Sequence, residues 1–196
     1  MSVRRKQPVG KRSATHHVLV LLSGGIDSSA CVGFYRAQKM AVEALFVNYG
    51  QPGAKQERVA ALAISRHYQI KIHEAAVRGV AVVRAGFVPG RNALLVATAL
   101  SCVAPESGLI ALGIHAGVPY VDCRPGFLTA CQALADVYHG GAVRIAAPFV
   151  EWSKADIVTA ARDLKVPLQR TYSCEAGGAM ACGVCLSCLD RARMLP

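Results

Sequence analysis

Residues Val18–Ser29 read VLVLLSGGIDSS, a wholly apolar run that ends in a turn rich in glycine and serine. The run Val18–Leu22 has no polar residue on either face, which is typical of a strand buried inside a parallel sheet. The two glycines that follow allow the backbone to turn tightly, and Ser28 opens a segment with helical character. A buried strand that leads directly into a helix is the unit from which parallel α/β sheets are built.

The same unit recurs along the 196-residue chain. Short apolar runs predict strands at Val18–Leu22, Ala44–Asn48, Ile70–Ala75, Leu109–Ile114 and Val143–Ala146. The longer segments predict helices at Ser28–Gln38, Lys55–His67, Asn92–Val103, Phe127–Tyr138 and Lys154–Leu164. This alternation predicts an α/β fold with a doubly wound, mainly parallel five-stranded sheet, in which ligands bind beyond the carboxyl ends of the strands.

The composition of the chain excludes several classes of protein. Hydrophobic residues make up 53% of the sequence and charged residues 17%, which allows a substantial core and excludes a disordered or fibrous protein. No run approaches the ~20 apolar residues of a membrane span, and no secretory signal is recognisable. The sequence therefore predicts a soluble, cytoplasmic protein with no membrane partner.

The net charge of +10 is concentrated near the start of the sequence. Residues 1–16 contain no acidic residue, and their basic residues are Arg4, Arg5, Lys6, Lys11 and Arg12. We expect a basic, flexible tail at 1–16, an α/β domain at 17–170 and a metal-binding segment at 171–196. A solvated leader explains the tail more simply than a contact with nucleic acid does.

The loop after the first strand has the chemistry of an anion site. Its glycines let the backbone approach a ligand closely, and the first amides of the next helix are unpaired donors with a partial positive charge. The serine hydroxyls add further donors, so the loop fits a pyrophosphate-sized anion. Asp27 either helps to hold a Mg²⁺ that bridges phosphates or caps the helix. Turn-and-cap chemistry alone is the structural alternative for the whole loop.

Four of the eight cysteines are clustered near the end of the sequence, as Cys174-x7-Cys182-x2-Cys185-x2-Cys188. Clustered thiols without a secretory signal indicate metal ligands rather than disulfide bonds. Four thiolates at this spacing can close a tetrahedron around a structural Zn²⁺. An iron–sulfur cluster is the main alternative, because it also takes four thiolates.

Further motifs follow one another in order: Asn48-Tyr49-Gly50-Gln51, Phe87-Val88-Pro89-Gly90-Arg91-Asn92, Tyr120-Val121-Asp122-Cys123-Arg124-Pro125 and Lys154-Ala155-Asp156-Ile157. The Ser-Gly-Gly-x-Asp-Ser loop resembles that of the ATP pyrophosphatase (PP-loop) superfamily. The order and spacing of the whole series resemble the 7-cyano-7-deazaguanine synthase (QueC) family of queuosine-precursor biosynthesis. The resemblance runs from about Val18 to Arg191, nearly the whole chain.

This resemblance implies an ATP-dependent carbon–nitrogen ligase with an adenine nucleotide alpha hydrolase-like fold. Members of the family convert 7-carboxy-7-deazaguanine and ammonia to the nitrile through an acyl adenylate and an amide, with release of AMP and pyrophosphate. The resemblance also implies Mg²⁺ with ATP, and it allows a homodimer because members commonly form dimers.

The roles of single residues follow from the same resemblance. Catalytic roles are implied for Asp27, Lys154 and Arg124. ATP binding is implied for Leu22, Ser23, Gly24, Gly25, Asp27, Ser28, Ser29, Arg91 and Lys154, and substrate binding for Asn92, Tyr120, Asp122 and Arg124. Several of these residues also have a structural interpretation. Asn92 fits a helix cap, Asp122 and Arg124 fit a loop-fixing pair, and the residues around Lys154 fit a capping box.

Several loops depart from the family pattern. Gly126 stands where a glutamate is common, Pro52-Gly53 replaces a basic pair, residues 113–120 are compressed and lack an acidic residue, and the segment before Phe87 is short. These loops are expected to surround the substrate, so two other functions stay open. One is a divergent enzyme that adenylates a deazaguanine acid and transfers it to an amine of a protein or nucleic acid. The other is a non-catalytic nucleotide-binding module.

Overall fold

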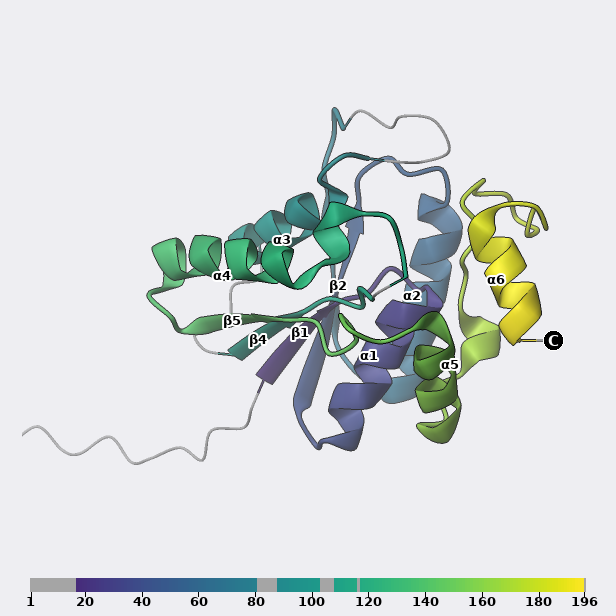
Figure 1. Cartoon of the computed structure of the whole chain (residues 1–196), viewed down its shortest axis with the longest axis horizontal. Helices are drawn as coiled ribbons and strands as arrows, with labels where there is room; N and C mark the ends of the chain where they lie inside the picture. The colour runs from purple at the N-terminus through teal and green to yellow at the C-terminus, as the bar shows by residue number, and fades with distance from the viewer. Residues whose placement is uncertain (1–16, 81–87, 103–107, 116, 196) are drawn as a thin grey trace, which may run out of the picture.

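The computed structural model describes residues 17–80, 88–102, 108–115 and 117–195, and its centre is one parallel sheet (Figure 1). The strands are β1 (His17–Leu21), β2 (Ala41–Asn48), β3 (Ile72–Ala76), β4 (Gly108–Ala111) and β5 (Val143–Ala146). They lie in the order β3-β2-β1-β4-β5, and all four neighbouring pairs are parallel. The predicted five-stranded, doubly wound sheet is therefore confirmed.

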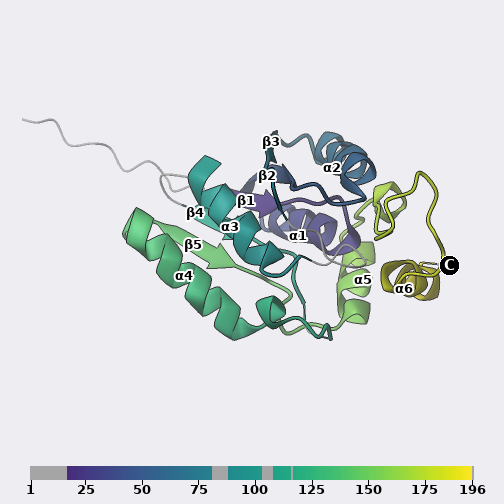
Figure 2. The ribbon, with the colours of Figure 1, turned by 90° about the horizontal axis from the view of Figure 1, so that it is seen from above.

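Helices cover both faces of this sheet (Figures 1 and 2). One face carries α1 (Ile26–Ala37), α2 (Ala54–Tyr68) and α5 (Lys154–Asp163), and the other carries α3 (Arg91–Cys102) and α4 (Pro125–His139). The short helices η2 (Val121–Cys123) and η3 (Leu168–Arg170) lie in connections, and α6 (Leu186–Met194) lies beyond α5 at the end of the described chain. None of the described helices combines the length and apolar character needed to cross a membrane.

The central strand β1 shows why the sequence folds this way. Val18 and Val20 point into the core under α1, α2 and α5, whereas Leu19 and Leu21 point into the core under α3 and α4. All four are buried, and full burial of one such side chain stabilises the fold by about 1.5–3 kcal/mol. The unbroken apolar run is thus required by a strand with helices on both sides.

The binding position follows from the direction of the connections. The chain leaves β1 through α1 on one face, and it enters the neighbouring strand β4 from α3 on the other face. The strand order reverses between β1 and β4, so a crevice is expected beyond their carboxyl ends.

Two differences from the predicted elements have a physical reason. Strand β4 ends at Ala111 rather than Ile114, because the chain then turns onto the first turn of α1 at Gly113. Helix α6 was not anticipated, since the segment around the cysteines lacks an apolar helical pattern, and Cys188 is its buried residue. The predicted end of the third helix at Val103 lies outside the described residues.

Candidate functional site

The loop Leu22–Gly25 and the first turn of α1 are the place where the sequence predicts an anion site. The Oγ atoms of Ser23 and Ser28 are 3.1 Å apart. The Ser23 Oγ accepts from the Gly25 amide at 3.3 Å, and the Ser28 hydroxyl donates to the Gly25 carbonyl at 3.2 Å. Among the described residues, no side chain caps α1 at Gly25. The amides of this turn are thus directed toward the open end of the sheet, where an anion is favoured.

Two of the predicted loop residues belong to the core rather than to the surface of this site. Leu22 is 1% exposed, and its amide extends the sheet by donating to the Leu45 carbonyl at 2.9 Å. Ser29 is fully buried, and its hydroxyl has no hydrogen-bond partner in the described part of the chain. Any contact of these two residues with a nucleotide remains a prediction.

Gly24 holds the loop against the helix α2. Its φ is +81°, and a Cβ added there would lie 2.6 Å from the Glu57 carbonyl oxygen and 2.7 Å from the Ala61 nitrogen. The Gly24 carbonyl also accepts a hydrogen bond from the amide of Tyr172 at 2.9 Å. The loop therefore has a fixed position, and only glycine fits there.

Asp27 and Lys154 meet beside the loop, although they are 127 residues apart in the sequence. Lys154 Nζ donates to Asp27 Oδ1 at 2.5 Å, and the two side chains are 21% and 24% exposed. His115, which follows β4, places its Nε2 3.8 Å from Asp27 Oδ2. The sequence assigned no role to His115, and its position after the carboxyl end of a strand is the signal that could have found it.

The capping box predicted around Lys154 is present in the structure. Ser153 and Asp156 form a complete capping box at the start of α5, and hydrogen bonds from Ser153 hold the pKa of the Asp156 carboxyl below its usual value. The cap fixes the first turn of α5, and Lys154 in that turn reaches Asp27. The segment that starts at Ser153 therefore both caps α5 and places Lys154 beside Asp27.

A second group of polar residues surrounds Glu57 in the first turn of α2. Gln51 Nε2 donates to Glu57 Oε2 at 2.8 Å, and Gln51 Oε1 accepts from the Tyr49 amide at 2.9 Å. Burial raises the pKa of the Glu57 carboxyl above its usual value. The hydrogen bond from Gln51 and the charge of Arg91 lower this pKa, but by less than burial raises it. The sequence did not single out Glu57, although an acidic residue in a first helical turn near the site is a recognisable signal.

Arg91 lies at the start of α3, where it links this group to the next loop. Its guanidinium donates from Nε and Nη2 to Asn92 Oδ1, both at 3.3 Å. Its charge and a hydrogen bond counteract the burial that raises the pKa of the Tyr49 hydroxyl. Arg91 is thus held between two loops at the carboxyl edge of the sheet. Phe87, at the start of the same motif, lies outside the described residues.

Asn92 and Asp122 tie α3 to η2. Asn92 is 2% exposed, and its Nδ2 donates to the Asp122 carbonyl at 3.0 Å. Asp122 Oδ2 in turn accepts from the Asn92 amide at 3.3 Å, so a carboxylate from 30 residues away serves the start of the helix. These contacts give both residues a structural role, and their binding of a substrate remains a prediction.

Arg124 and Tyr120 are more accessible. Arg124 is exposed, and its Nη2 donates to the Val118 carbonyl at 3.2 Å. Tyr120 is 40% exposed. In the described chain no ion pair joins Arg124 to Asp122, and the carboxylate of Asp122 is turned to α3 instead. The loop-fixing pair considered for these two residues is therefore absent.

The four predicted metal ligands come together. The Sγ atoms of Cys174, Cys182, Cys185 and Cys188 all lie within 4.8 Å of one another. The Cys182 amide donates to Cys174 Sγ at 3.3 Å, and the Cys185 amide donates to Cys182 Sγ at 3.4 Å. The first of these bonds is the main reason that the pKa of Cys174 falls to about 6. The amides directed at Cys174 and Cys182 lower the pKa of these two thiols, and four cysteines at this spacing suit a closed metal centre.

The cysteine segment is joined to the anion loop. A Cβ on Gly177 would clash with the Pro52 carbonyl oxygen, so the segment packs against the loop after β2. Arg191 in α6 donates to Thr171 Oγ1 at 2.7 Å and to the Leu168 carbonyl at 3.0 Å. The bond from the Tyr172 amide to the Gly24 carbonyl therefore connects residues 171–196 to the loop after β1.

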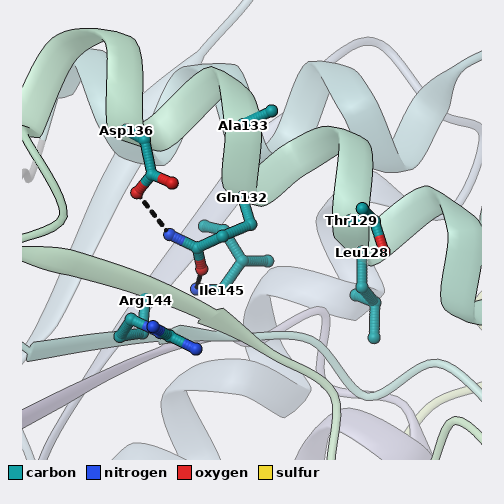
Figure 3. Close-up of a pocket in the computed structure, with 7 residues that line it drawn as sticks. All are labelled: Leu128, Thr129, Gln132, Ala133, Asp136, Arg144 and Ile145. Atoms are coloured by element: carbon teal, nitrogen blue, oxygen red, sulfur yellow. Dashed lines mark hydrogen bonds between the residues drawn. The ribbon is translucent and has the colours of Figure 1, made fainter.

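Two shallow cavities lie outside this constellation. One, of about 420 Å³, is at the carboxyl ends of β2 and β3 and is lined in part by Asn48, Tyr49 and Arg78. The other, of about 430 Å³, lies between α4 and the free edge of β5 (Figure 3). There Gln132 reaches from α4 to the strand, where Oε1 accepts from the Ile145 amide at 2.8 Å and Nε2 donates to the Val143 carbonyl at 3.0 Å. In this second cavity, Gln132 therefore satisfies backbone groups on the outer edge of β5. The cavity has no glycine-serine loop among the residues that line it.

Comparison with known proteins agrees with this arrangement. Solved structures with the same fold include the NMN synthetase of Francisella tularensis (TM-score 0.53, 17% identity, 85% of this chain and 69% of that chain). Another is the U34-tRNA thiolase NcsA of Methanococcus maripaludis with its [4Fe-4S] cluster (TM-score 0.50, 16% identity, 92% of this chain and 64% of that chain). At these identities the likeness concerns the fold.

Sequence relatives are nearer. The chain is 36% identical to a 7-cyano-7-deazaguanine synthase of Synechococcus sp. (strain RCC307) over 88% of this chain and 91% of that protein. It is 35% identical to the synthase of that name from Prochlorococcus marinus (strain NATL2A) over 92% of this chain and 93% of that protein. The family model for "Queuosine biosynthesis protein QueC" matches residues 17–82 and 70–195. Because this model and these relatives match nearly the whole chain, the chain belongs to the QueC family.

Proposed function

We propose that this protein is an ATP-dependent ligase that converts 7-carboxy-7-deazaguanine and ammonia to 7-cyano-7-deazaguanine. The observation that carries the proposal is the Asp27–Lys154 pair at the edge of a glycine-serine loop. This places a cation and a carboxylate beside the helix N-terminus that would receive phosphates. The name of the similar synthases supports the product, and the acid is the one that the family resemblance of the sequence implies.

The first step is adenylation of the acid. A carboxylate oxygen of the substrate attacks the α-phosphorus of ATP, the bond to the β-phosphate oxygen breaks, and pyrophosphate leaves. The amides of the loop after β1 would bind the phosphates, and Lys154 would offset the charge that develops on the leaving pyrophosphate. Mg²⁺ bound with ATP would neutralise part of the phosphate charge.

The second and third steps form the nitrile. Ammonia adds to the acyl carbon, a proton is lost, and AMP leaves to give the amide. The amide oxygen then attacks the α-phosphorus of a second ATP and pyrophosphate leaves, after which loss of AMP and of the two amide protons gives the nitrile. Arg124 and Tyr120 are accessible at the loop beyond β4, where they would bind the acid, while Asn92 and Asp122 would hold that loop on α3. The planar guanidinium of Arg124 suits a carboxylate.

The four-cysteine cluster would hold a metal ion with a structural role. Its four sulfurs can fill a tetrahedral Zn²⁺ site and leave no position for water. The contacts of this segment with Pro52 and Gly24 suggest its purpose, which is to support the loop that binds phosphates.

The test is mass spectrometry of a reaction that contains the purified protein, Mg-ATP, ammonium and 7-carboxy-7-deazaguanine. We expect the nitrile together with AMP and pyrophosphate, and no pyrophosphate from the Asp27→Ala variant. Accumulation of the adenylate or the amide would favour transfer to another amine, as in the divergent enzyme. ATP binding without any turnover of the acid would contradict the proposed reaction and favour a nucleotide-binding module.

A further inference from the structure

The carboxylate of Asp27 lies between two cationic or hydrogen-bonding groups from different elements. Lys154 Nζ of α5 is 2.5 Å from Oδ1, and His115 Nε2 of the loop after β4 is 3.8 Å from Oδ2. The side chains are largely buried, with His115 12% exposed and Asp27 24% exposed. Each oxygen of the Asp27 carboxylate therefore has a side-chain nitrogen of another segment nearby.

The position of His115 is fixed by its neighbours in the chain. A Cβ on Gly113 would lie 2.7 Å from the carbonyl carbon and oxygen of Asp27, so this loop is pressed against the first turn of α1. Ile114 is buried in the core under α3 and α4. The loop thus brings the imidazole to Asp27 through tight backbone contact rather than by a chance side-chain rotamer.

The pairing of Lys154 with Asp27 bears on the proposed reaction. Lys154 Nζ donates to Asp27 Oδ1 at 2.5 Å, and the proposed role requires the same Nζ to move toward the phosphates of ATP, which would lengthen this bond. If Lys154 turned away, Asp27 would keep a partly buried charge without its main partner, and such a charge is costly. A second group on Oδ2 would remove that cost.

We propose that His115 is a positioning residue that holds Asp27 through Oδ2 while Lys154 turns from Asp27 to the phosphates of Mg-ATP. The carboxylate needs only a small rotation to bring Oδ2 within hydrogen-bond distance of the imidazole Nε2, because the two atoms are 3.8 Å apart. This inference deepens the proposed function, and it rests on that function for the binding of ATP. It does not depend on the identity of the acid.

The test measures Mg-ATP binding by isothermal titration calorimetry, with no acid substrate present. The variants are His115→Leu, His115→Gln, Lys154→Met and the double variant His115→Leu/Lys154→Met, with His139→Leu at the far end of α4 as the control. A lost hydrogen bond to a charged group predicts a dissociation constant about tenfold higher for His115→Leu. The Gln variant keeps an N–H donor near the Nε2 position and should stay within about threefold of the unsubstituted protein.

The double variant provides a readout that a merely structural role would not move. If His115 acts through Lys154, the double variant binds Mg-ATP no more weakly than Lys154→Met alone. Additive losses, unchanged binding by His115→Leu, or equal weakening by Leu and Gln in folded variants would each overturn the inference. Melting temperatures of all variants identify any that fail to fold.

The same experiment separates this inference from the proposed function. If the unsubstituted protein binds Mg-ATP and the variants behave as expected, but no nitrile forms from the deazaguanine acid, the role of His115 stands and the proposed substrate fails. If the nitrile forms and His115→Leu binds Mg-ATP normally, the proposed function stands and the role of His115 fails. Absence of Mg-ATP binding by the unsubstituted protein would overturn both.

Discussion

Replacement of Gly24 by alanine tests whether the packing of the glycine-serine loop after β1 on α2 determines the proposed binding of Mg-ATP. Gly24 has a φ of +81°, and the new Cβ would lie 2.6 Å from the Glu57 carbonyl oxygen, 2.7 Å from the Ala61 nitrogen and 2.8 Å from the Ala60 Cβ. All three atoms belong to one helix and cannot move separately. Since ordinary contact begins at 3.4 Å, the loop has to retreat by about 0.8 Å, and a displacement of about 1 Å can reduce catalysis on the order of 100-fold.

The matched control is Gly141→Ala in the turn before β5. Gly141 has a φ of +82° and no atom within 4 Å of an added Cβ, so this variant experiences only the backbone strain. That strain is worth about 1–2 kcal/mol in either protein. The overpacking at Gly24 adds about 1–3 kcal/mol, which at about 2–4 °C per kcal/mol lowers the melting temperature of Gly24→Ala below that of the control.

Thermal unfolding and calorimetric titration with Mg-ATP measure the two effects separately. We expect Gly141→Ala to bind Mg-ATP like the unsubstituted protein, and Gly24→Ala to lose most of its affinity while remaining folded at 20 °C or below. Equal affinity in the two variants would refute the reasoning, because it would show that the position of the loop does not depend on α2.

Three further predictions concern the metal centre, a buried carboxyl and the sheet edge. Cys185→Ser should lose bound metal, as measured by elemental analysis, and should melt at a lower temperature. Cys102 is an exposed cysteine outside the cluster, so Cys102→Ser should keep its metal content and its melting temperature. Unchanged metal content in Cys185→Ser would contradict the four-ligand site. Burial raises the pKa of the Glu57 carboxyl in the folded protein, so its ionisation destabilises the fold once the pH rises above the carboxyl's pKa in the unfolded chain, about 4.3. Glu57→Gln should therefore raise the melting temperature at pH 7. This gain in melting temperature should vanish near pH 4, where the carboxyl is protonated in both states. Gln132→Ala removes two hydrogen bonds to the edge strand β5 and should destabilise the fold by about 1–3 kcal/mol. An unchanged melting temperature, together with no association in size-exclusion chromatography, would show that Gln132 is not needed to protect the backbone groups of this edge.

The sequence predicts the sheet well because its signal is local. A strand buried on both faces must be apolar throughout, and the run Val18–Leu22 satisfies that condition with no knowledge of its neighbours. The phosphate loop and the cysteine spacing are local patterns too, and the structure brings the four sulfurs together as predicted. Element ends are less predictable, as β4 shows, since its end depends on a contact between Gly113 and α1.

The site beyond the loop depends on contacts between distant segments. Asp27 meets Lys154 across 127 residues, and Asn92 meets Asp122 across 30. The sequence places each of these residues after a strand or at a helix start, which is enough to predict one edge of the sheet. Their pairing cannot be predicted in this way, because it depends on the lengths of the intervening connections and on the packing of α5 beside α1. For the same reason His115 received no role from the sequence.

The bond from the Tyr172 amide to the Gly24 carbonyl has a consequence for how the protein is made. Gly24 and Tyr172 are far apart in the sequence, so a ribosome produces the glycine-serine loop well before the residue that supports it. Domains fold progressively during synthesis, so a nascent chain can assemble β1 and β2 long before this loop has its final partner. A chain interrupted before Tyr172 would therefore carry the complete glycine-serine loop without this backbone support.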